Sequence, residues 1–309
     1  MKRYLPLFAS AAICAALPVS AQEAKTYPAP SEIVAAAKAD EWVAITPSDL
    51  LVMDLSPDSK GKPRRVVIQL IPAPFSQGWV SNIRKLAAAH WWDGTSINRV
   101  QDNYVVQWGD ATEKKALPDG LAKIPENYGY AHALKRPIAL DPIFIPPNDM
   151  FRHTSFYAGF PIAGVSSPDS DGNWPIHCYA MVGVGRNLSP DTGTGAELYT
   201  VIGHAPRHLD RNIALVGRVI EGIEHMSSLP RGTGALGFYE QEEERVPILS
   251  VRLGNEAKDV PAFEYLSTDS DSFAAYADAR ANRRDPFFNI PAGGADICNI
   301  PVPIRRKAN

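Results

Sequence analysis

The alternation of apolar and polar positions predicts a chain built mainly from short β-strands. Residues 50–55 and 65–71 are rich in Val, Leu and Ile, and a turn segment with Pro, Asp, Ser and Gly separates them. Two such runs around a turn are typical of a β-hairpin. Further strands are predicted at residues 96–100, 103–108, 175–184, 197–202, 211–219 and 246–253. The fold class that this pattern favours is mainly β.

Apolar residues at helical spacing are fewer. Residues 78–90 carry Trp79, Val80, Ile83, Leu86 and Ala87 at intervals that place them on one face of a helix. Ser31 is expected to cap a short Ala-rich helix that ends near residue 39. Two other helices are expected at residues 221–229 and 272–284. Helices are therefore a minor part of the predicted structure.

Proline is unusually frequent, with 27 Pro beside 22 Gly in 309 residues. Because proline breaks helix interiors and central strands, much of the chain must be loop, and long helical arrays and coiled coils are excluded. Residues 111–173 hold many of these prolines and show no lasting period. We therefore expect this stretch to be an ordered but irregular insertion.

The first residues have the pattern of a signal peptide. Lys2 and Arg3 precede the apolar, uncharged residues 5–17, and a small-residue cleavage signature ends at Ala21. The alternative is a membrane anchor, which is disfavoured because a spanning helix needs about 20 apolar residues. We expect residues 22–309 to be exported to an oxidising compartment and to contain no membrane span.

Charge and cysteine usage narrow the function further. The formal net charge is −3, so the chain lacks the surplus of basic residues that would indicate nucleic-acid binding. Cleavage of residues 1–21 would remove Cys14 and leave Cys178 and Cys298. These two cysteines could form one disulfide, or they could be two buried thiols, and the sequence leaves both open because their geometry is unknown. No motif predicts a metal or another cofactor.

Several segments resemble, in the same order, the cyclophilin-type peptidyl-prolyl isomerases. They are the strand 65–70, Trp92-Asp93-Gly94-Thr95, Asn98-Arg99-Val100, residues 104–110, residues 196–202, Leu209-Asp210 and residues 216–222. The resemblance implies a closed antiparallel β-barrel capped by two helices, at residues 78–90 and 221–229. Closure of the sheet would remove its exposed edges.

The resemblance also sets the expected domain organisation. A cyclophilin-like domain would span residues 51–254 and contain the insertion 111–173. Residues 22–50 would form a leader with a short helix, after the signal peptide 1–21. Residues 255–309 would be a partly helical C-terminal extension.

The chemistry of prolyl isomerisation explains which residues such a site needs. Rotation about the X–Pro bond faces a barrier of ~18–20 kcal/mol from amide resonance. A hydrogen-bond donor aimed at the prolyl nitrogen stabilises the twisted transition state, so neither a nucleophile nor a metal is required. The resemblance places the catalytic arginine at Arg99, and Gln107 would hold the substrate backbone and orient Arg99. The other substrate-binding residues that it implies are Tyr104, Val105, Glu197, Tyr199, His208 and Leu209.

Three departures from the family pattern bear on activity. Asn98 replaces the usual His before the arginine, Glu197 replaces a backbone-binding Gln, and Ile213 replaces a pocket His. A Glu197–Arg99 ion pair could hold the guanidinium away from the substrate. We expect a prolyl isomerase of the bacterial periplasm that acts on proline-containing segments of exported client proteins. The alternative is a cyclophilin-like peptide-binding or chaperone module with weak or no isomerase activity.

Overall fold

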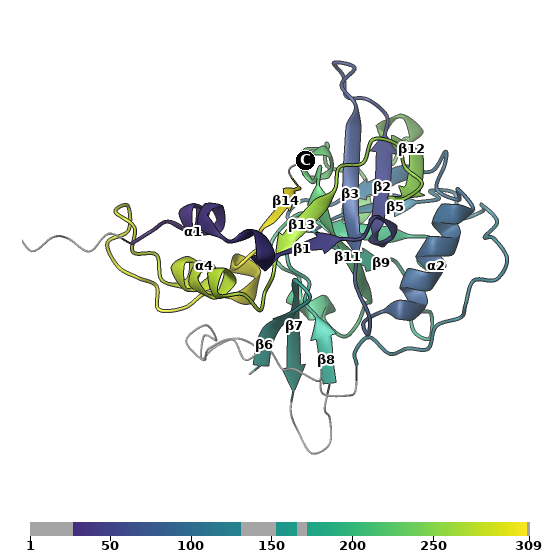
Figure 1. Cartoon of the computed structure of the whole chain (residues 1–309). Helices are drawn as coiled ribbons and strands as arrows, with labels where there is room; N and C mark the ends of the chain where they lie inside the picture. The colour runs from purple at the N-terminus through teal and green to yellow at the C-terminus, as the bar shows by residue number, and fades with distance from the viewer. Residues whose placement is uncertain (1–26, 131–152, 166–171, 308–309) are drawn as a thin grey trace, which may run out of the picture.

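The computed structural model describes residues 27–130, 153–165 and 172–307. The predicted signal peptide and part of the predicted insertion lie outside these residues. The strands at the centre of the molecule are β2 (Leu50–Leu55), β3 (Arg64–Leu70), β4 (Ser96–Val100), β5 (Val105–Gly109), β9 (Met181–Val184), β10 (Leu198–Val201), β11 (Leu215–Glu221) and β12 (Val246–Leu253). They form a closed barrel in the order β10-β5-β4-β12-β2-β3-β11-β9, in which every pair is antiparallel (Figure 1). The predicted barrel is confirmed.

The β2–β3 hairpin is buried on both faces. Leu51 and Met53 belong to the main core with the barrel interior, whereas Leu50 and Val67 pack into a second cluster that includes Phe263. Successive strand residues point to opposite faces. The continuous apolar runs of these strands therefore reflect cover from outside the barrel as well as packing inside it.

Two helices lie against the barrel. Helix α2 (Gln77–Ala88) buries Trp79, Val80, Ile83, Leu86 and Ala87, as its apolar spacing predicts, and it contacts β11 and β12. Helix α3 (Glu224–Ser227) contacts β3 and is a single turn, shorter than the predicted helix at residues 221–229. Glycine at the start of that stretch explains the difference, because Gly222 has a φ of +83° and cannot begin a helix there.

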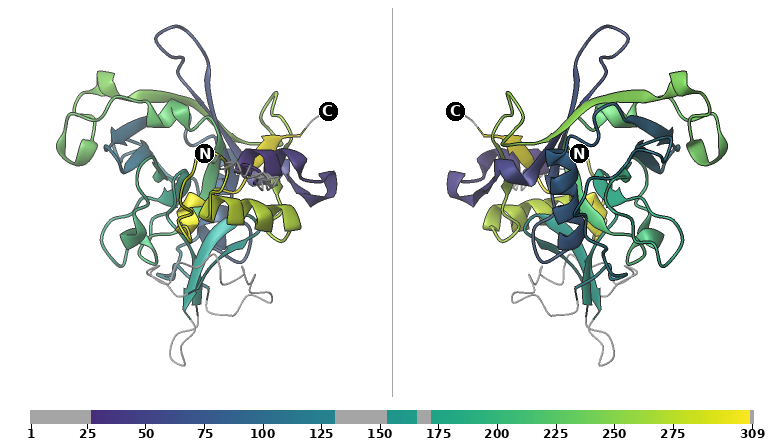
Figure 2. Two further views of the ribbon diagram at one scale, coloured as in Figure 1. Left: turned by 90° about the vertical axis from the view of Figure 1, so that its left-hand side faces the viewer. Right: turned by 90° about the vertical axis from the view of Figure 1, so that its right-hand side faces the viewer.

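A second sheet lies outside the barrel and joins both ends of the chain. It has the order β1-β13-β14 and consists of β1 (Trp42–Ile45), β13 (Phe263–Leu266) and β14 (Ile304–Arg306). Beside it, helix α1 (Pro30–Ala36) packs on helix α4 (Asp271–Ala281), as Figures 1 and 2 show. The expected partly helical extension is thus also partly sheet. Helix α1 starts at Pro30 with Ala29 as its N-cap, so the predicted Ser31 cap is wrong.

A third sheet occupies the second half of the predicted insertion. It has the order β6-β7-β8 and consists of β6 (His153–Tyr157), β7 (Phe160–Val165) and β8 (Gly172–Pro175). The prediction of an irregular insertion is wrong for this part, because its described proline does not interrupt a strand. Pro161 is the second residue of β7, and Pro175, just after the predicted insertion, is the last residue of β8. The strand predicted at residues 175–184 is correspondingly divided between β8 and β9.

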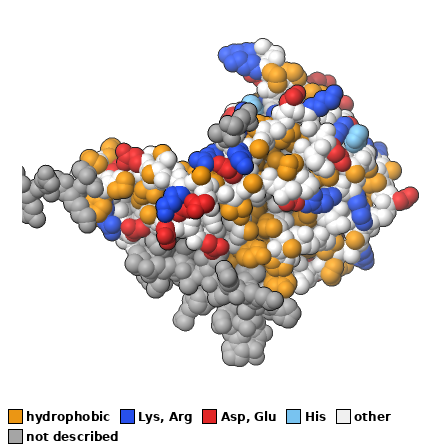
Figure 3. Space-filling view, in the orientation of Figure 1, with side chains coloured by type: hydrophobic (Ala, Val, Ile, Leu, Met, Phe, Trp, Pro, Cys, Tyr) orange, Lys and Arg blue, Asp and Glu red, His pale blue; other side chains and the backbone are white. Residues whose placement is uncertain are grey.

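Surface charge is mixed on the face that Figure 3 shows, where Lys and Arg side chains lie among Asp and Glu side chains over the outer sheet. Within the described ranges, no helix has the length and apolar character that a membrane span requires.

Candidate active site

Strand register places three predicted site residues in one row around the barrel wall. Arg99 of β4 lies opposite Gln107 of β5, and Gln107 lies opposite Tyr199 of β10. Tyr199 in turn lies opposite Gly183 of β9. Residues that face each other across an antiparallel pair share one side of the sheet. Arg99, Gln107 and Tyr199 therefore project from the same wall of the barrel.

That wall is the outer one. Trp108 and Leu198, which neighbour Gln107 and Tyr199 in sequence, belong to the main core. Because strand side chains alternate between the two faces, Gln107 and Tyr199 must point outward. The register that closes the barrel thus also assembles the site on its surface.

An apolar cluster lies at one end of this row. Val105, Tyr199 and Val201 form a buried cluster of their own, and Tyr104, Leu209 and Ile213 pack against it. The family resemblance leads us to expect the proline-binding pocket at this group of six residues, which is therefore called the apolar pocket below. All four pocket residues predicted as Tyr104, Val105, Tyr199 and Leu209 come together in it. The ring of His208 stacks on that of Tyr104 with 6.1 Å between centroids.

Arg99 is held by hydrogen bonds to three acceptors. Its Nε donates to the backbone carbonyl of Leu236 at 2.8 Å, and its Nη1 donates to Oε1 of Gln107 at 3.2 Å. Its Nη2 donates to Oε1 of Gln101. A guanidinium has five N–H groups, so these bonds fix its plane and leave two N–H groups for other acceptors.

Two aromatic rings flank the same guanidinium. The Cζ atom of Arg99 lies 5.7 Å from the ring centroid of Tyr104 and 5.2 Å from that of Phe238. Contacts of this kind attract a cation to the ring faces. Burial lowers the pKa of Arg99, but arginine stays protonated in proteins. The site therefore offers a rigidly held cation at the edge of the apolar pocket.

A polar cavity of about 660 Å³ opens beside Arg99. Its lining includes Asn98, Arg99, Gln107, Glu197, Leu236 and Phe238, and the name polar cavity refers to this set. Arg99 and Gln107 thus face both the cavity and the neighbouring apolar pocket. Leu236 and Phe238 belong to the exposed large apolar residues, so the rim of the cavity is apolar while its wall is polar.

Glu197 is the acidic group of the polar cavity. Burial raises the pKa of Glu197 to about 7, against hydrogen bonds that lower it from the Asp110 backbone and from the side chains of Asn98 and Gln107. Among the described residues Arg99 forms no ion pair with Glu197. Gln107 lies between them, because its oxygen accepts from Arg99 and its amide donates to the carboxylate. The guanidinium is therefore not drawn away by the acid.

The hydroxyl of Tyr199 does not enter the apolar pocket. It lies 2.8 Å from Nε2 of His177, a residue that is fully buried. A buried hydroxyl without a partner would be costly. Tyr199 therefore presents its ring to the pocket and satisfies its polar group elsewhere.

Four contributors to this site were not predicted from the sequence. Gln101 is two residues beyond Arg99, and this spacing could have suggested a shared strand face. Leu236, Phe238 and His177 have no such signal, because they reach the site from distant parts of the chain. In the part of the chain that the structure describes, no group of three or more His, Cys, Asp or Glu side chains is placed to hold a metal ion.

A closed antiparallel barrel whose outer wall presents a fixed arginine beside an apolar pocket has the arrangement that prolyl isomerisation requires. The family model for the cyclophilin type peptidyl-prolyl cis-trans isomerase/CLD matches residues 62–253. The chain therefore belongs to the cyclophilin-type peptidyl-prolyl cis-trans isomerases.

One solved cyclophilin agrees with this fold over most of its length. Cyclophilin AquaCyp293 from Hirschia baltica is 22% identical, with a TM-score of 0.64, and the match covers 87% of this chain and 95% of that one. A cyclophilin type peptidyl-prolyl cis-trans isomerase from Cryptosporidium parvum is 10% identical over 65% of this chain and 98% of that one, with a TM-score of 0.37. No curated protein sequence gives a significant match.

Proposed function

We propose that this chain is an exported prolyl isomerase that speeds the folding of exported proteins by acting on their proline-containing segments. The observation that carries the proposal is the placement of Arg99. Its guanidinium is fixed by Gln107, Gln101 and Leu236 at the edge of the apolar pocket. Two of its N–H groups remain available to a substrate.

The reaction needs no bond to form or break except the partial double bond of the peptide. As the X–Pro bond twists, the prolyl nitrogen regains its lone pair. An Arg99 N–H directed at that nitrogen stabilises the twisted form over both planar forms. Since three hydrogen bonds already hold the guanidinium, it does not need to reorganise during the reaction.

The pocket and Gln107 would supply the remaining requirements. The proline ring would enter the apolar pocket, where the faces of Tyr104 and Tyr199 and the side chain of Leu209 exclude water. Gln107 would bind the flanking peptide through its amide, which lies beside the guanidinium. Holding the two sides of the X–Pro bond at separate contacts allows one side to rotate against the other.

Two features support export. Residues 1–21 carry the signal-peptide pattern. Cys178 and Cys298 form a disulfide with a Cα–Cα distance of 5.1 Å, and disulfides persist in oxidising compartments such as the bacterial periplasm. We expect protein recovered from the periplasm of a bacterial host to begin at Gln22. A cytosolic chain that retains residues 1–21 would contradict this part of the proposal.

The catalytic claim is tested by refolding a substrate whose slow step is proline isomerisation. We expect Arg99→Ala to lower kcat/KM about 100- to 1000-fold, the loss typical of one donor to a transition state. Arg283→Ala, which removes an arginine of the C-terminal extension, should leave the rate unchanged. Equal rates for wild type and Arg99→Ala would refute the claim.

A second candidate function is peptide binding with little turnover. The observation that favours it is Glu197, whose carboxyl group lines the polar cavity where the family resemblance leads us to expect a glutamine. The same preparations should be titrated with a proline peptide. Binding by wild type without any acceleration of isomerisation would select this second function.

A further inference from the structure

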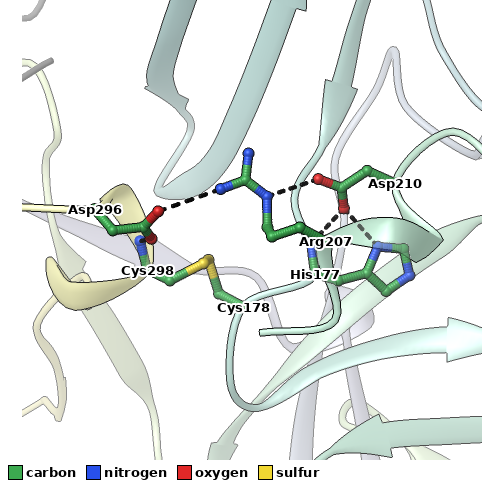
Figure 4. Close-up of a disulfide and its surroundings, with 6 residues drawn as sticks. All are labelled: His177, Cys178, Arg207, Asp210, Asp296 and Cys298. Atoms are coloured by element: carbon green, nitrogen blue, oxygen red, sulfur yellow. Dashed lines mark hydrogen bonds and ion pairs between the residues drawn. A yellow bond between two sulfur atoms is a disulfide. The ribbon is translucent and has the colours of Figure 1, made fainter. Parts of the chain in front are cut away.

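A line of polar groups, fully buried at His177 and Asp210, leads from the apolar pocket to the C-terminal extension. His177 contacts Tyr199 through Nε2 and Asp210 through Nδ1, both at 2.8 Å. Arg207 Nε donates to the other oxygen of Asp210 at 2.8 Å, and its Nη1 donates to Asp296 at 3.4 Å. Figure 4 shows the part from His177 to Asp296. This set of five residues is called the polar line.

The direction of each hydrogen bond in the polar line follows from its chemistry. Both oxygens of Asp210 accept hydrogen bonds, Oδ2 from Arg207 and Oδ1 from the backbone N–H of His177, so this carboxyl group acts as an acceptor. Nδ1 of His177 must then carry the proton that it donates to Asp210. Burial lowers the pKa of His177, so the ring is neutral and Nε2 is an acceptor. The Tyr199 hydroxyl therefore donates to Nε2.

The polar line fixes two walls of the apolar pocket. Tyr199 lies on β10, and its ring is stacked on that of His177 with an interplanar angle of 9°. Asp210 directly follows Leu209, the pocket residue that ends a 3-10 turn at Arg207–Leu209. The carboxylate of Asp210 also accepts from the backbone N–H of His177 at 3.0 Å. One carboxylate thus links β10, through His177, to the turn that carries Leu209.

The C-terminal extension holds the far end of this arrangement. Asp296 caps a 3-10 turn by accepting from the backbone N–H of Cys298 at 2.8 Å. Cys298 is bonded to Cys178, the residue after His177 (Figure 4). The segment 296–298 is therefore tied to the rest of the polar line at two points, by the ion pair of Asp296 with Arg207 and by the disulfide to the residue after His177.

We propose that His177 is a positioning residue for substrate binding, and that the segment 296–298 keeps it in place. His177 turns the Tyr199 hydroxyl away from the apolar pocket, so that a tyrosine presents only its ring to the substrate proline. The inference rests on the proposed function, because the pocket is taken to bind proline. It assigns the C-terminal extension a role in the site although this extension contributes no pocket residue.

The test is a double-mutant cycle with His177→Leu and Tyr199→Phe. We expect His177→Leu alone to raise KM for a proline peptide about tenfold with a smaller change in kcat, because the hydroxyl loses its acceptor and the ring shifts. In the Tyr199→Phe background no hydroxyl needs an acceptor, so His177→Leu should change KM less than about twofold. Coupling of this size is typical of residues in direct contact.

A purely structural role for His177 predicts a different result. The tenfold loss would then persist in the Tyr199→Phe background, and this additive outcome would overturn the inference. Tyr199→Phe alone is conservative in shape and tells whether the fold tolerates a change at this position. The four proteins are also titrated with the same peptide, so that coupling in Kd decides the inference even if wild type shows no turnover. An inactive wild type refutes the proposed function and leaves the binding cycle decisive.

The C-terminal contacts are tested by Asp296→Asn and Cys298→Ser. Each should raise KM about threefold, and the Tyr199→Phe background should remove the effect. Asp285→Asn is the matched control, since it breaks an ion pair of the same extension with Arg283. An unchanged KM for both test variants, or an equal rise for the control, would contradict the role of segment 296–298.

Discussion

The apolar pocket and the polar cavity share Arg99 but differ in how completely their polar groups are satisfied. In the pocket, the buried Tyr199 hydroxyl is bonded to His177, and the other side chains are apolar except for the partly buried Tyr104. In the cavity, Oδ1 of Asn98 is buried with no hydrogen-bond partner among the described residues, and Glu197 has a raised pKa. The pocket is thus complete before a peptide arrives, whereas the cavity keeps hydrogen-bonding capacity for one.

This difference matches the two tasks of a prolyl isomerase. A proline ring offers no donor, so its pocket gains from having every polar group turned away. The peptide beside the proline carries N–H and C=O groups, which need partners when they leave water. An unpaired buried acceptor such as Asn98 Oδ1 lowers stability, and a peptide N–H could offset that cost on binding.

Of the two changes that test this comparison, filling the space behind the pocket ring has the larger expected effect. A Cβ atom at Gly183 would lie 2.2 Å from Cζ of Tyr199, so Gly183→Ala must displace the ring. Because a shift of about 1 Å can cost about 100-fold in rate, we expect kcat/KM to fall about 100-fold. The polar cavity should be unaffected, so the pKa of Glu197 should not change.

The kinetics of Gly183→Ala are compared with those of Gly172→Ala. A Cβ atom at Gly172 would have its nearest neighbour at 3.7 Å, which is ordinary contact. A similar loss for both variants would show that activity depends on general stability, and the distinction between a complete pocket and an open cavity would fail.

Most strands of the barrel could be predicted from their apolar runs, whereas the closure of the barrel was predicted from the family resemblance. For example, Val66, Ile68 and Leu70 face the core in β3. The row of site residues from Arg99 to Tyr199 follows from the pairing of β4, β5 and β10. The sheet β1-β13-β14 was missed for physical reasons. Its strand Phe263–Leu266 is only four residues long, and one of the two partners of this strand comes from the opposite end of the chain.

His177 illustrates what the sequence could not supply at the site. Its neighbours along the chain are Ile176 and Cys178, which give it the context of an ordinary core residue. Its two partners lie 22 and 33 residues further on. Only the folded arrangement shows that these partners are a pocket tyrosine and a buried aspartate. Side-chain contacts across loops have no local pattern, whereas strand pairing has one.

The smaller expected effect concerns the polar cavity and its pH dependence. Burial raises the pKa of Glu197 to about 7 in the folded state, above its ordinary value of 4.5. Between these two values the folded state binds more protons than the unfolded state, so the free energy of unfolding falls as pH rises. Glu197→Gln removes this term. Its stability relative to wild type should rise by about 2 kcal/mol from pH 5 to pH 6.5, at about 1.36 kcal/mol per unit.

Denaturant unfolding at several pH values measures this difference, and Glu41→Gln is the control. Hydrogen bonds from Ser272 lower the pKa of Glu41, so its folded and unfolded values lie at or below 4.5 and its stability difference should stay flat above pH 5. If the Glu197→Gln difference is equally flat, Glu197 is already ionised in the folded protein. The cavity would then hold a permanent negative charge beside Gln107. Its polar groups would be as completely satisfied as those of the pocket, and the contrast between the two regions would be lost.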